Sequence, residues 1–335
     1  MNKISKTGLL LKTHVLGCVL IVLCFLVLTN CKTKEEDTYL FRASLIVTEN
    51  HTWFKAFEYF GEILEERSDG RMKVQVYPSE QLAKEIEAIR LIQAEVIDMT
   101  VTGSMLNNWF ELAAFCELPF FFKDTIEARN FIHGKVGKEM ERQMIEVTGL
   151  RPVGYFQRGP RHLTSNRPIK HPDDLQGLIV RVPNVPSFVT AWSALGAKPT
   201  PMAFSEVFTS LQQGTIEAQE NPFDLIKNAG FYEVQKYINL TEHVISWGYP
   251  VIGETQFQKL PDDLKVIFLE AAKDMQAYER RLFTDNEKNI KDELSAKGME
   301  FIEVDKEAFI KKSEDAIYSS LSPEMKAVYK ELKNE

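Results

Sequence analysis

The chain has 335 residues, of which 44% are hydrophobic and 26% are charged, and its formal net charge is −8 at pH 7. This length allows two domains with an ample hydrophobic core. The acidic balance excludes binding of nucleic-acid phosphate by the global field of the protein, so an anionic ligand requires a local cationic site.

The first thirty residues have the pattern of a targeting segment. They contain three lysines and no acidic residue, and an apolar run follows at 15–28. That run has the length of a signal-peptide core and is too short to span a bilayer. It ends in LTNC at 28–31, which resembles the lipobox of bacterial lipoproteins. We therefore expect a lipoprotein signal peptide at 1–30, lipidation of Cys31 and a polar tether at 31–38. An uncleaved N-terminal anchor is the alternative, and either arrangement places the domain outside the cytoplasm, in the periplasm.

Cysteine usage agrees with this arrangement. Of the four cysteines, Cys18 and Cys24 lie in the leader and Cys31 is the expected lipid site, so only Cys116 remains in the body of the chain. The body therefore has no intramolecular disulfide to form. Alanine and phenylalanine precede Cys116, which predicts a small, buried hydrophobic residue.

Predicted strands and helices alternate along the body of the chain. In 53–64 apolar residues recur at helical spacing, whereas in 72–76 they alternate as in a strand. Such alternation predicts an α/β fold with parallel strands and right-handed crossovers. The expected strands lie near 40–47, 72–76, 97–101, 151–157, 161–165, 178–182 and 215–218, and the expected helices near 53–64, 86–96, 125–147, 205–214 and 262–297.

One charged residue stands inside an apolar strand. The segment LIVRV at 178–182 is apolar except for Arg181, and Pro183 ends it, which predicts a buried parallel strand. Ligands of open α/β sheets bind beyond the carboxyl ends of the strands. A guanidinium placed there matches a carboxylate in bidentate fashion. A structural ion pair is the alternative, but a lone charge in an apolar strand is costly without a partner.

Three motifs, in order, carry a family resemblance: RVPN at 181–184, PTPMAFSEV at 199–207 and QENP at 219–222. Together they resemble the extracytoplasmic solute-binding subunits of TRAP transporters, the DctP family. Weaker similarity covers nearly the whole mature chain, for example at YPS (77–79) and LPF (118–120). This coverage indicates that the resemblance extends to the whole fold.

The resemblance implies an α/β two-lobe periplasmic binding protein fold, with a parallel or mixed sheet in each lobe and a long helix bridging both lobes. On this basis lobe I comprises 39–160 plus about 247–280, and lobe II comprises 161–246 plus about 290–335. The bridging helix is expected at about 262–297. Hinge closure of two lobes around a ligand is typical of periplasmic binding proteins.

The same motifs imply a carboxylate-binding site. Arg181 is expected to hold the carboxylate, and Arg161 to add a second cationic contact, with Arg158 as the competing candidate. Asn221 is expected to orient the ligand, because a carboxamide both donates and accepts hydrogen bonds. An ordinary Asn-Pro turn is the alternative. Three further positions match the pocket wall of the family: Pro183, Asn184 and Phe204. Phe204 suits a core position equally well.

Lobe I offers fewer candidates. Asn50 and His51 precede the first helix, where anions are favoured, and Thr102 follows the strand at 97–101. A structural role is the alternative for His51. Trp247 lies near an expected lobe crossing, where its ring could stack on a sugar, and core packing is the alternative.

Signatures of common enzymes are absent from the sequence. It contains no G-x-G-x-x-G, P-loop, H-E-x-x-H or G-x-S-x-G motif, and its six histidines do not show metal-ligand spacing. We therefore expect a receptor, not an enzyme, that uses no cofactor or metal, binds no nucleic acid, and passes a small organic acid anion to TRAP membrane permease subunits. The alternatives are a binding lipoprotein of an ABC importer, an extracytoplasmic sugar-acid enzyme and a lipoprotein that only interacts with other proteins.

The substrate is expected to be a sugar acid. Sialic acid-binding relatives carry an Asp-Arg pair after the Pro-Ser-x-Gln-Leu segment and a Glu on the following strand, where this chain has Glu85-Ile86 and Thr102. This departure disfavours sialic acid. A sugar acid such as a hexuronate is favoured, a C4-dicarboxylate is next, and a 2-oxo acid is a further alternative.

Overall fold

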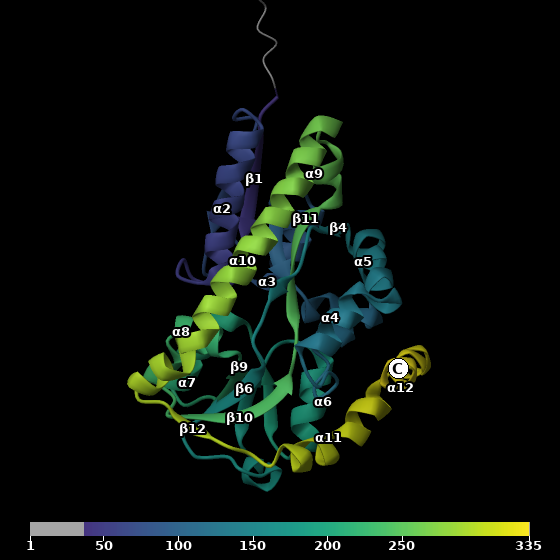
Figure 1. The fold of residues 1–335 in the computed structure, drawn as a ribbon. Coiled ribbons are helices and arrows are strands. Elements are labelled where there is room, and N and C mark those ends of the chain that lie inside the picture. The colour runs from purple at the N-terminus through teal and green to yellow at the C-terminus, as the bar shows by residue number, and fades with distance from the viewer. Residues whose placement is uncertain (1–36, 335) are drawn as a thin grey trace, which may run out of the picture. The chain divides into compact units, whose positions relative to one another are not determined.

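Two mixed β-sheets of six strands each form the framework of the protein (Figure 1). The computed structural model describes residues 37–334, and one compact unit begins at Tyr39. The expected signal peptide at 1–30 and the expected lipid site at Cys31 lie outside the described residues. Each sheet, with the helices packed on it, is called a lobe below.

The sheet of the first lobe combines parallel and antiparallel strands. Its strands are β1 (Tyr39–Ser44), β2 (Met72–Tyr77), β3 (Met99–Thr102), β4 (Leu150–Pro152), β5 (Phe156–Gln157) and β11 (Trp247–Gly253). Their order is β2-β1-β3-β11-β4, and β5 also pairs with β11. β1 is parallel to β2 and β3, because helices connect these strands, whereas β11 is antiparallel to its neighbours.

The helices of the first lobe follow the apolar spacing of the sequence. The α-helices are α2 (Thr52–Arg67), α3 (Glu85–Gln93), α4 (Thr125–His133), α5 (Lys135–Thr148) and α9 (Glu254–Gln258), and two 3₁₀ helices span Ser104–Asn108 and Glu111–Glu117. α2 buries Phe57, Phe60 and Leu64 on one face. Its N-terminus is capped by the His51 side chain, which accepts a hydrogen bond from the backbone N–H of Trp53.

The single helix expected at 125–147 is two helices. Gly134 has an extended backbone between α4 and α5, so the helical hydrogen bonds stop there. The second helix then begins close against the end of the first. A Cβ atom at Gly137 would lie only 2.3 Å from the backbone oxygen of Ile132, so only glycine fits this approach. Apolar spacing continues through the break, which is why periodicity alone did not show it.

The sheet of the second lobe has the order β12-β10-β6-β9-β7-β8. Its strands are β6 (Arg161–Ser165), β7 (Ile179–Val182), β8 (Lys198–Pro201), β9 (Ala218–Asn221), β10 (Tyr237–Val244) and β12 (Glu300–Ile302). The α-helices around it are α6 (Pro186–Ala194), α7 (Val207–Gln212), α8 (Phe223–Asn228) and α11 (Lys306–Ser320), with 3₁₀ helices at Pro172–Leu175, Phe204–Glu206 and Phe231–Glu233. The strand expected at 215–218 instead begins at Ala218, so Asn221 lies on the strand β9 and not after it.

The helix α10 (Asp262–Ala296) joins the two lobes, as Figure 1 shows. Its 35 residues correspond to about 50 Å of helix. Phe268 and Met275 pack in the core beneath α2, whereas Ile290 and Leu294 pack in a core of the second lobe. The long bridging helix expected from the resemblance is therefore confirmed.

The chain crosses between the sheets at 158–160 and again at 245–246. After α11 the chain continues into α12 (Pro323–Asn334). Met325 and Tyr329 of α12 pack with Phe121 of the first lobe. The segment at about 290–335 was expected to belong to lobe II, but its last helix, α12, contacts the first lobe.

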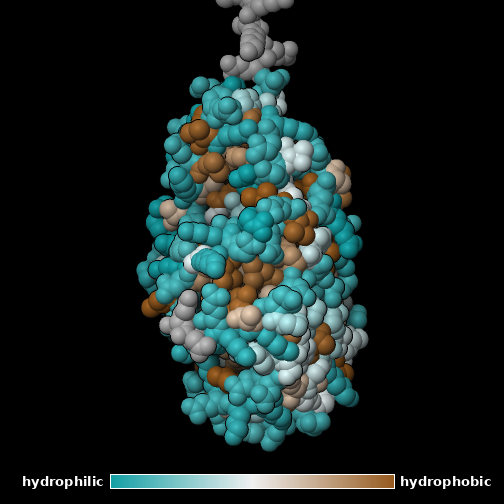
Figure 2. All heavy atoms as spheres, turned by 90° about the vertical axis from the view of Figure 1, so that its right-hand side faces the viewer, coloured by the Kyte–Doolittle hydropathy of each residue, from teal (hydrophilic) through white to brown (hydrophobic). Residues whose placement is uncertain are grey.

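The two mixed sheets and the bridging helix confirm the predicted α/β two-lobe fold class. Figure 2 shows a largely hydrophilic face with an apolar area near its middle. Among residues 37–334, no helix is long and apolar enough to cross a membrane.

Candidate functional site

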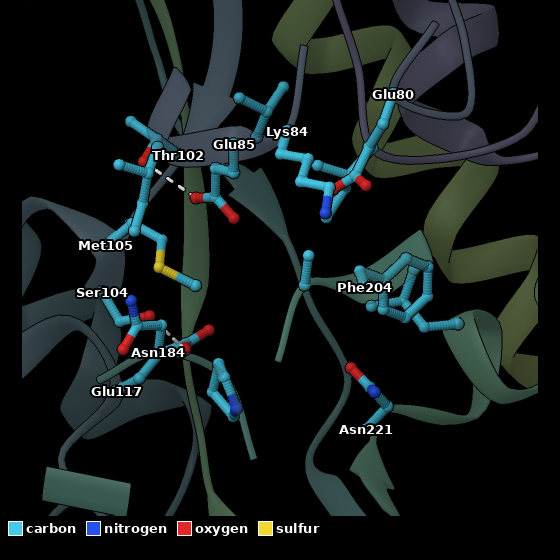
Figure 3. A pocket seen from close by; sticks show the side chains of 18 of the residues that line it. Glu80, Lys84, Glu85, Thr102, Ser104, Met105, Glu117, Asn184, Phe204 and Asn221 are labelled. Atoms are coloured by element: carbon cyan, nitrogen blue, oxygen red, sulfur yellow. Dashed lines mark hydrogen bonds between the residues drawn. The ribbon is translucent and has the colours of Figure 1, made fainter. Parts of the chain in front are cut away.

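A cavity of about 320 Å³ lies between the two lobes. The ends of the parallel strands β3 and β7 reach it with Thr102 and with Arg181, and the first-lobe residue Trp53 faces it as well. Its position agrees with the rule that ligands of α/β sheets bind beyond the carboxyl ends of the strands. Figure 3 shows side chains from both lobes around this space, including Glu85 and Asn221.

Arg181 is the cation of this cavity without an acidic partner. Its side chain is 3% exposed, and its Nε and Nη2 atoms donate hydrogen bonds to the backbone oxygen of Met202, at 3.1 and 2.7 Å. No carboxylate of the described chain lies within ion-pair distance of Arg181. Burial lowers the pKa of Arg181 to about 10, so the guanidinium still carries its charge at neutral pH. A buried charge of this kind favours an anionic ligand.

Arg161 also lines the cavity, but its charge is matched within the protein. Its Nε and Nη2 atoms donate to both carboxylate oxygens of Glu220, at 2.5 and 2.6 Å. Burial by itself would raise the pKa of Glu220, but Arg161 and His243 outweigh it and hold that pKa at about 2. His243 completes the cluster through a 2.8 Å hydrogen bond to Glu220. Arg161 is thus part of a buried charge network that extends behind the cavity wall.

Arg158, the competing candidate from the sequence, faces the same cavity. It forms an ion pair with Glu117, whose other oxygen accepts a 2.5 Å hydrogen bond from Ser104. The guanidinium carbon of Arg158 lies 5.6 Å from the centre of the Trp53 ring. Both candidate arginines for the second contact therefore reach the cavity, and both have a carboxylate partner.

Most of the other predicted positions also come together here. Pro183, Asn184, Phe204, Asn221 and Thr102 all line the cavity. Asn221 donates a 2.6 Å hydrogen bond to Gln219, which holds its carboxamide in place. The ring centre of Phe204 lies 6.0 Å from the guanidinium carbon of Arg181, so the ring forms an apolar wall beside the cation.

Three predicted positions lie elsewhere. His51 is buried, and its ring nitrogens contact the carboxylate of Asp224, at 3.0 Å, and the backbone N–H of Trp53. Asn50 lies with it at a different hollow on the side of α10. Trp247 packs in the first-lobe core against Phe131, with ring centres 5.6 Å apart. The position of His51 agrees with the alternative of a structural role, and that of Trp247 agrees with the alternative of core packing.

Sequence reasoning did not predict acidic side chains in the cavity, although it noted Glu85 at the place where sialic acid-binding relatives carry an Asp-Arg pair. Glu80, Glu85 and Glu117 all line it, and Lys84 lies at its rim, where it pairs with Glu206. Burial raises the pKa of Glu85 to about 7, although a 2.9 Å hydrogen bond from Thr102 opposes the shift. Acidic residues are common on protein surfaces, so only the placement of Glu85 after the Pro-Ser-x-Gln-Leu segment could have marked one of them.

Two further sequence predictions concern metal binding and Cys116. Across residues 37–334 no group of three or more His, Cys, Asp or Glu side chains is placed to hold a metal ion. Cys116 is fully buried, as predicted, and burial raises the pKa of its thiol well above the usual value.

Comparison with known proteins identifies the family. Residues 43–323 match the family described as bacterial extracellular solute-binding protein, family 7 (DctP). The chain is 46% identical over 314 residues to the solute-binding protein RD1_1052 of Roseobacter denitrificans, covering 94% of this chain and 96% of that relative. It is 35% identical over 259 residues to the 2,3-diketo-L-gulonate-binding periplasmic protein YiaO of Escherichia coli, covering 76% and 78% of the two chains.

Solved structures give the same result. A crystal structure of a TRAP periplasmic solute binding protein from Roseobacter denitrificans, with bound L-galactonate, is 44% identical and has a TM-score of 0.86, covering 89% of this chain and 99% of that chain. A TRAP periplasmic solute binding protein from Haemophilus influenzae, with bound L-gulonate, is 30% identical with a TM-score of 0.82, covering 89% and 99%. This chain therefore belongs to the DctP family of TRAP extracytoplasmic solute-binding proteins.

Proposed function

We propose that this protein is the solute receptor of a TRAP transporter that captures a sugar acid in the cavity between its lobes and delivers it to the membrane permease. The observation that carries the proposal is Arg181, a buried cation on the cavity wall with no carboxylate partner in the described chain. Relatives with bound L-galactonate and L-gulonate support a sugar acid as the ligand.

The proposed binding mode follows from the side chains at the cavity. Arg181 holds the ligand carboxylate with the guanidinium edge that Met202 leaves unused. Arg161 adds a second guanidinium at the cavity, with its charge balanced by Glu220, and Asn221 orients the ligand through its carboxamide. Closure of the lobes excludes water, which strengthens these interactions because the local dielectric constant falls. No bond is broken in this scheme, so we propose a receptor and not an enzyme.

The remaining parts of the proposal concern location. The leader at 1–30 directs export, Cys31 carries the lipid, and 31–38 tethers the receptor at the periplasmic face of a membrane. Such a tether keeps the receptor near the permease, which raises the local concentration of the loaded protein.

A thermal-shift screen tests ligand binding. The protein without its leader, residues 32–335, is heated with uronates, aldonates, C4-dicarboxylates, 2-oxo acids or neutral sugars. A ligand at about a hundred times its dissociation constant should add roughly 2.7 kcal/mol of stability, which raises the Tm of a protein of this size by several degrees. Shifts confined to sugar acids support the proposal. No shift with any acid, from folded and ligand-free protein, would overturn it.

Delivery is tested with membrane vesicles that contain the cognate permease. Labelled sugar acid should enter the vesicles only when the receptor is added. Uptake that is independent of the receptor would contradict the proposed partnership.

A further inference from the structure

We propose that the first-lobe wall of the cavity accepts hydrogen bonds from hydroxyl groups of the ligand and disfavours a second carboxylate. The ligand is then a polyhydroxy monocarboxylate. Two glutamates, Glu80 and Glu85, form this wall, which is called the acidic wall below. The inference rests on the proposed function, because it assumes that Arg181 of the second lobe holds the ligand carboxylate. The acidic wall would favour aldonates and uronates, which have one carboxylate, over aldarates and C4-dicarboxylates, which have two. The Arg181 clamp alone would not distinguish these two groups of ligands.

Glu80 is held in an unfavourable backbone conformation at the cavity. Ser79 and Glu80 have φ angles of 54° and 56°, in the left-handed region that L side chains rarely adopt. Backbone hydrogen bonds fix this loop, from Ser79 to Val47 at 2.8 Å and from Glu80 to Leu45 at 2.9 Å. Strained residues of this kind cluster at ligand-binding sites, where the conformation is retained because it aims a side chain.

The side chain of Glu80 has an unused acceptor. Its Oε2 atom is buried and has no hydrogen-bond partner in the described chain. A buried acceptor without a donor is unfavourable, so this oxygen favours a ligand that brings an O–H group. A ligand carboxylate brings only acceptors and would leave both groups unpaired.

Glu85 presents a second acceptor from the first turn of α3. The hydroxyl of Thr102 donates to its Oε1 at 2.9 Å and so fixes the orientation of the carboxyl group. Figure 3 shows this bond and the other oxygen of Glu85 turned towards the cavity. The acidic wall therefore offers at least two placed oxygens to hydroxyl groups.

The charges of the cavity are divided between the lobes. Glu117 is paired with Arg158, and Arg161 with Glu220, so these groups balance one another. Arg181 on the second lobe has no ion-pair partner in the described chain and remains as the cation for the ligand, and the acidic wall lines the same cavity from the first lobe. Because burial raises the pKa of Glu85 to about 7, Glu85 is partly ionised at neutral pH. A second ligand carboxylate would therefore meet the negative charge of Glu80 and part of a charge at Glu85, whereas a hydroxyl would donate to their oxygens.

Isothermal titration calorimetry with ligands of one carbon skeleton tests the inference. Galactonate and galacturonate carry one carboxylate, galactarate carries two and galactitol carries none. We expect both monocarboxylates to bind, and galactarate to bind at least about 30-fold more weakly than galactonate because of like-charge contact. Galactitol should not bind measurably, because it offers no carboxylate to Arg181.

Substitution of the two glutamates of the acidic wall then tests whether they cause the preference for galactonate over galactarate. Glu80→Gln and Glu85→Gln keep the shape of the side chain but remove the charge, and the double variant should reduce the preference for galactonate over galactarate at least about fivefold. The double variant Glu270→Gln/Glu300→Gln, an equal charge change at exposed positions of α10 and β12, should leave the ratio unchanged. Circular dichroism checks that each variant is folded.

The outcomes separate the two proposals. Galactarate binding within threefold of galactonate, or an unchanged ratio in the double variant, would overturn the role of the acidic wall while leaving the receptor function intact. Absence of binding by any of the acids would overturn the receptor function and this inference together.

Discussion

At the scale of single residues, the three cavity arginines differ in what they are free to do. Arg158 and Arg161 each have a carboxylate within the protein, whereas Arg181 donates only to a backbone oxygen. The stability of the empty protein and its affinity for ligand should therefore respond differently to loss of Arg181 and of Arg161.

Loss of Arg181 should weaken binding strongly and spare the fold. We expect Arg181→Ala to weaken sugar-acid binding by about 2 to 5 kcal/mol, because the ligand carboxylate loses its charged partner. That corresponds to roughly 30-fold to several thousand-fold in the dissociation constant. The empty variant should be as stable as the parent protein or more so, because a buried charge without a carboxylate partner is removed. Calorimetry and urea unfolding measure the two effects.

The control for this change is Arg167→Ala, which removes an exposed arginine of the same lobe. It should alter neither affinity nor stability appreciably. A loss of affinity below about threefold in folded Arg181→Ala would contradict the carboxylate clamp.

Loss of Arg161 should instead destabilise the empty protein. Glu220 is fully buried, and its pKa is held at about 2 by Arg161 and His243 against the effect of burial. Arg161→Ala leaves that carboxylate without its bidentate partner, which typically costs about 3 to 5 kcal/mol. We expect this loss in urea unfolding at pH 7. Equal stability of the empty Arg161→Ala and Arg181→Ala variants would show that the assignment of the two roles is wrong.

At the scale of elements, the bridging helix α10 carries a buried acid where the chain crosses between lobes. Glu279 is fully buried, and its Oε2 accepts a 3.1 Å hydrogen bond from the backbone N–H of Gln157 on β5. Burial raises the pKa of Glu279 to about 8, and nearby Asp224 adds to the shift. The helix and the crossing segment are thus joined through a carboxyl group that remains protonated at neutral pH.

This shift predicts a pH-dependent stability with a defined sign. The unfolded chain releases the Glu279 proton near pH 4.5, whereas the folded protein retains it up to about pH 8. The folded state therefore binds more protons between these values, and its stability falls as the pH rises through this range. Glu279→Gln keeps an acceptor for Gln157 and cannot ionise, so relative to the parent it should gain roughly 1 to 4 kcal/mol between pH 5 and pH 8.5.

Urea unfolding at the two pH values measures this difference. The pKa of Glu85 and that of Glu287 are also raised to about 7, but both acids remain in both proteins and cancel in the comparison. Glu270→Gln, on the exposed side of α10, serves as the control and should show no such gain. A gain for Glu279→Gln that is the same at both pH values would contradict the raised pKa.

At the scale of the whole molecule, the global charge opposes the ligand while the cavity attracts it. The net charge of −8 becomes about −11 when the three lysines of the leader are removed. The long-range field therefore repels an anion, and only the local cation Arg181 favours it. Added salt screens the repulsion over distances beyond about 10 Å at 0.1 M.

The association rate should accordingly rise slightly with salt. We expect kon for a sugar-acid monoanion to increase by less than about threefold between 20 and 200 mM NaCl, because screening removes the global repulsion. Stopped-flow fluorescence is a suitable measurement, since Trp53 lines the cavity. A neutral sugar alcohol that leaves the signal unchanged is the control. A fall in kon of more than twofold would show that attraction to the cavity dominates at long range.

The sequence by itself determined the features that depend on neighbouring residues. Apolar spacing predicted α2, and the breaker Pro183 after an apolar run predicted the strand that presents Arg181. The uninterrupted segment after Pro261 predicted the long helix α10, whereas its bridging of the two lobes was implied by the family resemblance. Motifs within about 45 residues identified the family, and with it the two-lobe fold. These predictions succeeded because secondary structure and local motifs follow from short-range periodicity and backbone preference.

Only the tertiary structure decided which charges are free. Arg161 contacts Glu220 at a separation of 59 residues, and Arg158 contacts Glu117 at a separation of 41, whereas Arg181 has no carboxylate within ion-pair distance in the described chain. The placement of Glu85 and Arg181 at one cavity and the burial of His51 against Asp224 likewise join distant parts of the chain. The charge state and availability of a side chain depend on burial and on partners that folding brings near, and no local pattern in the sequence records them.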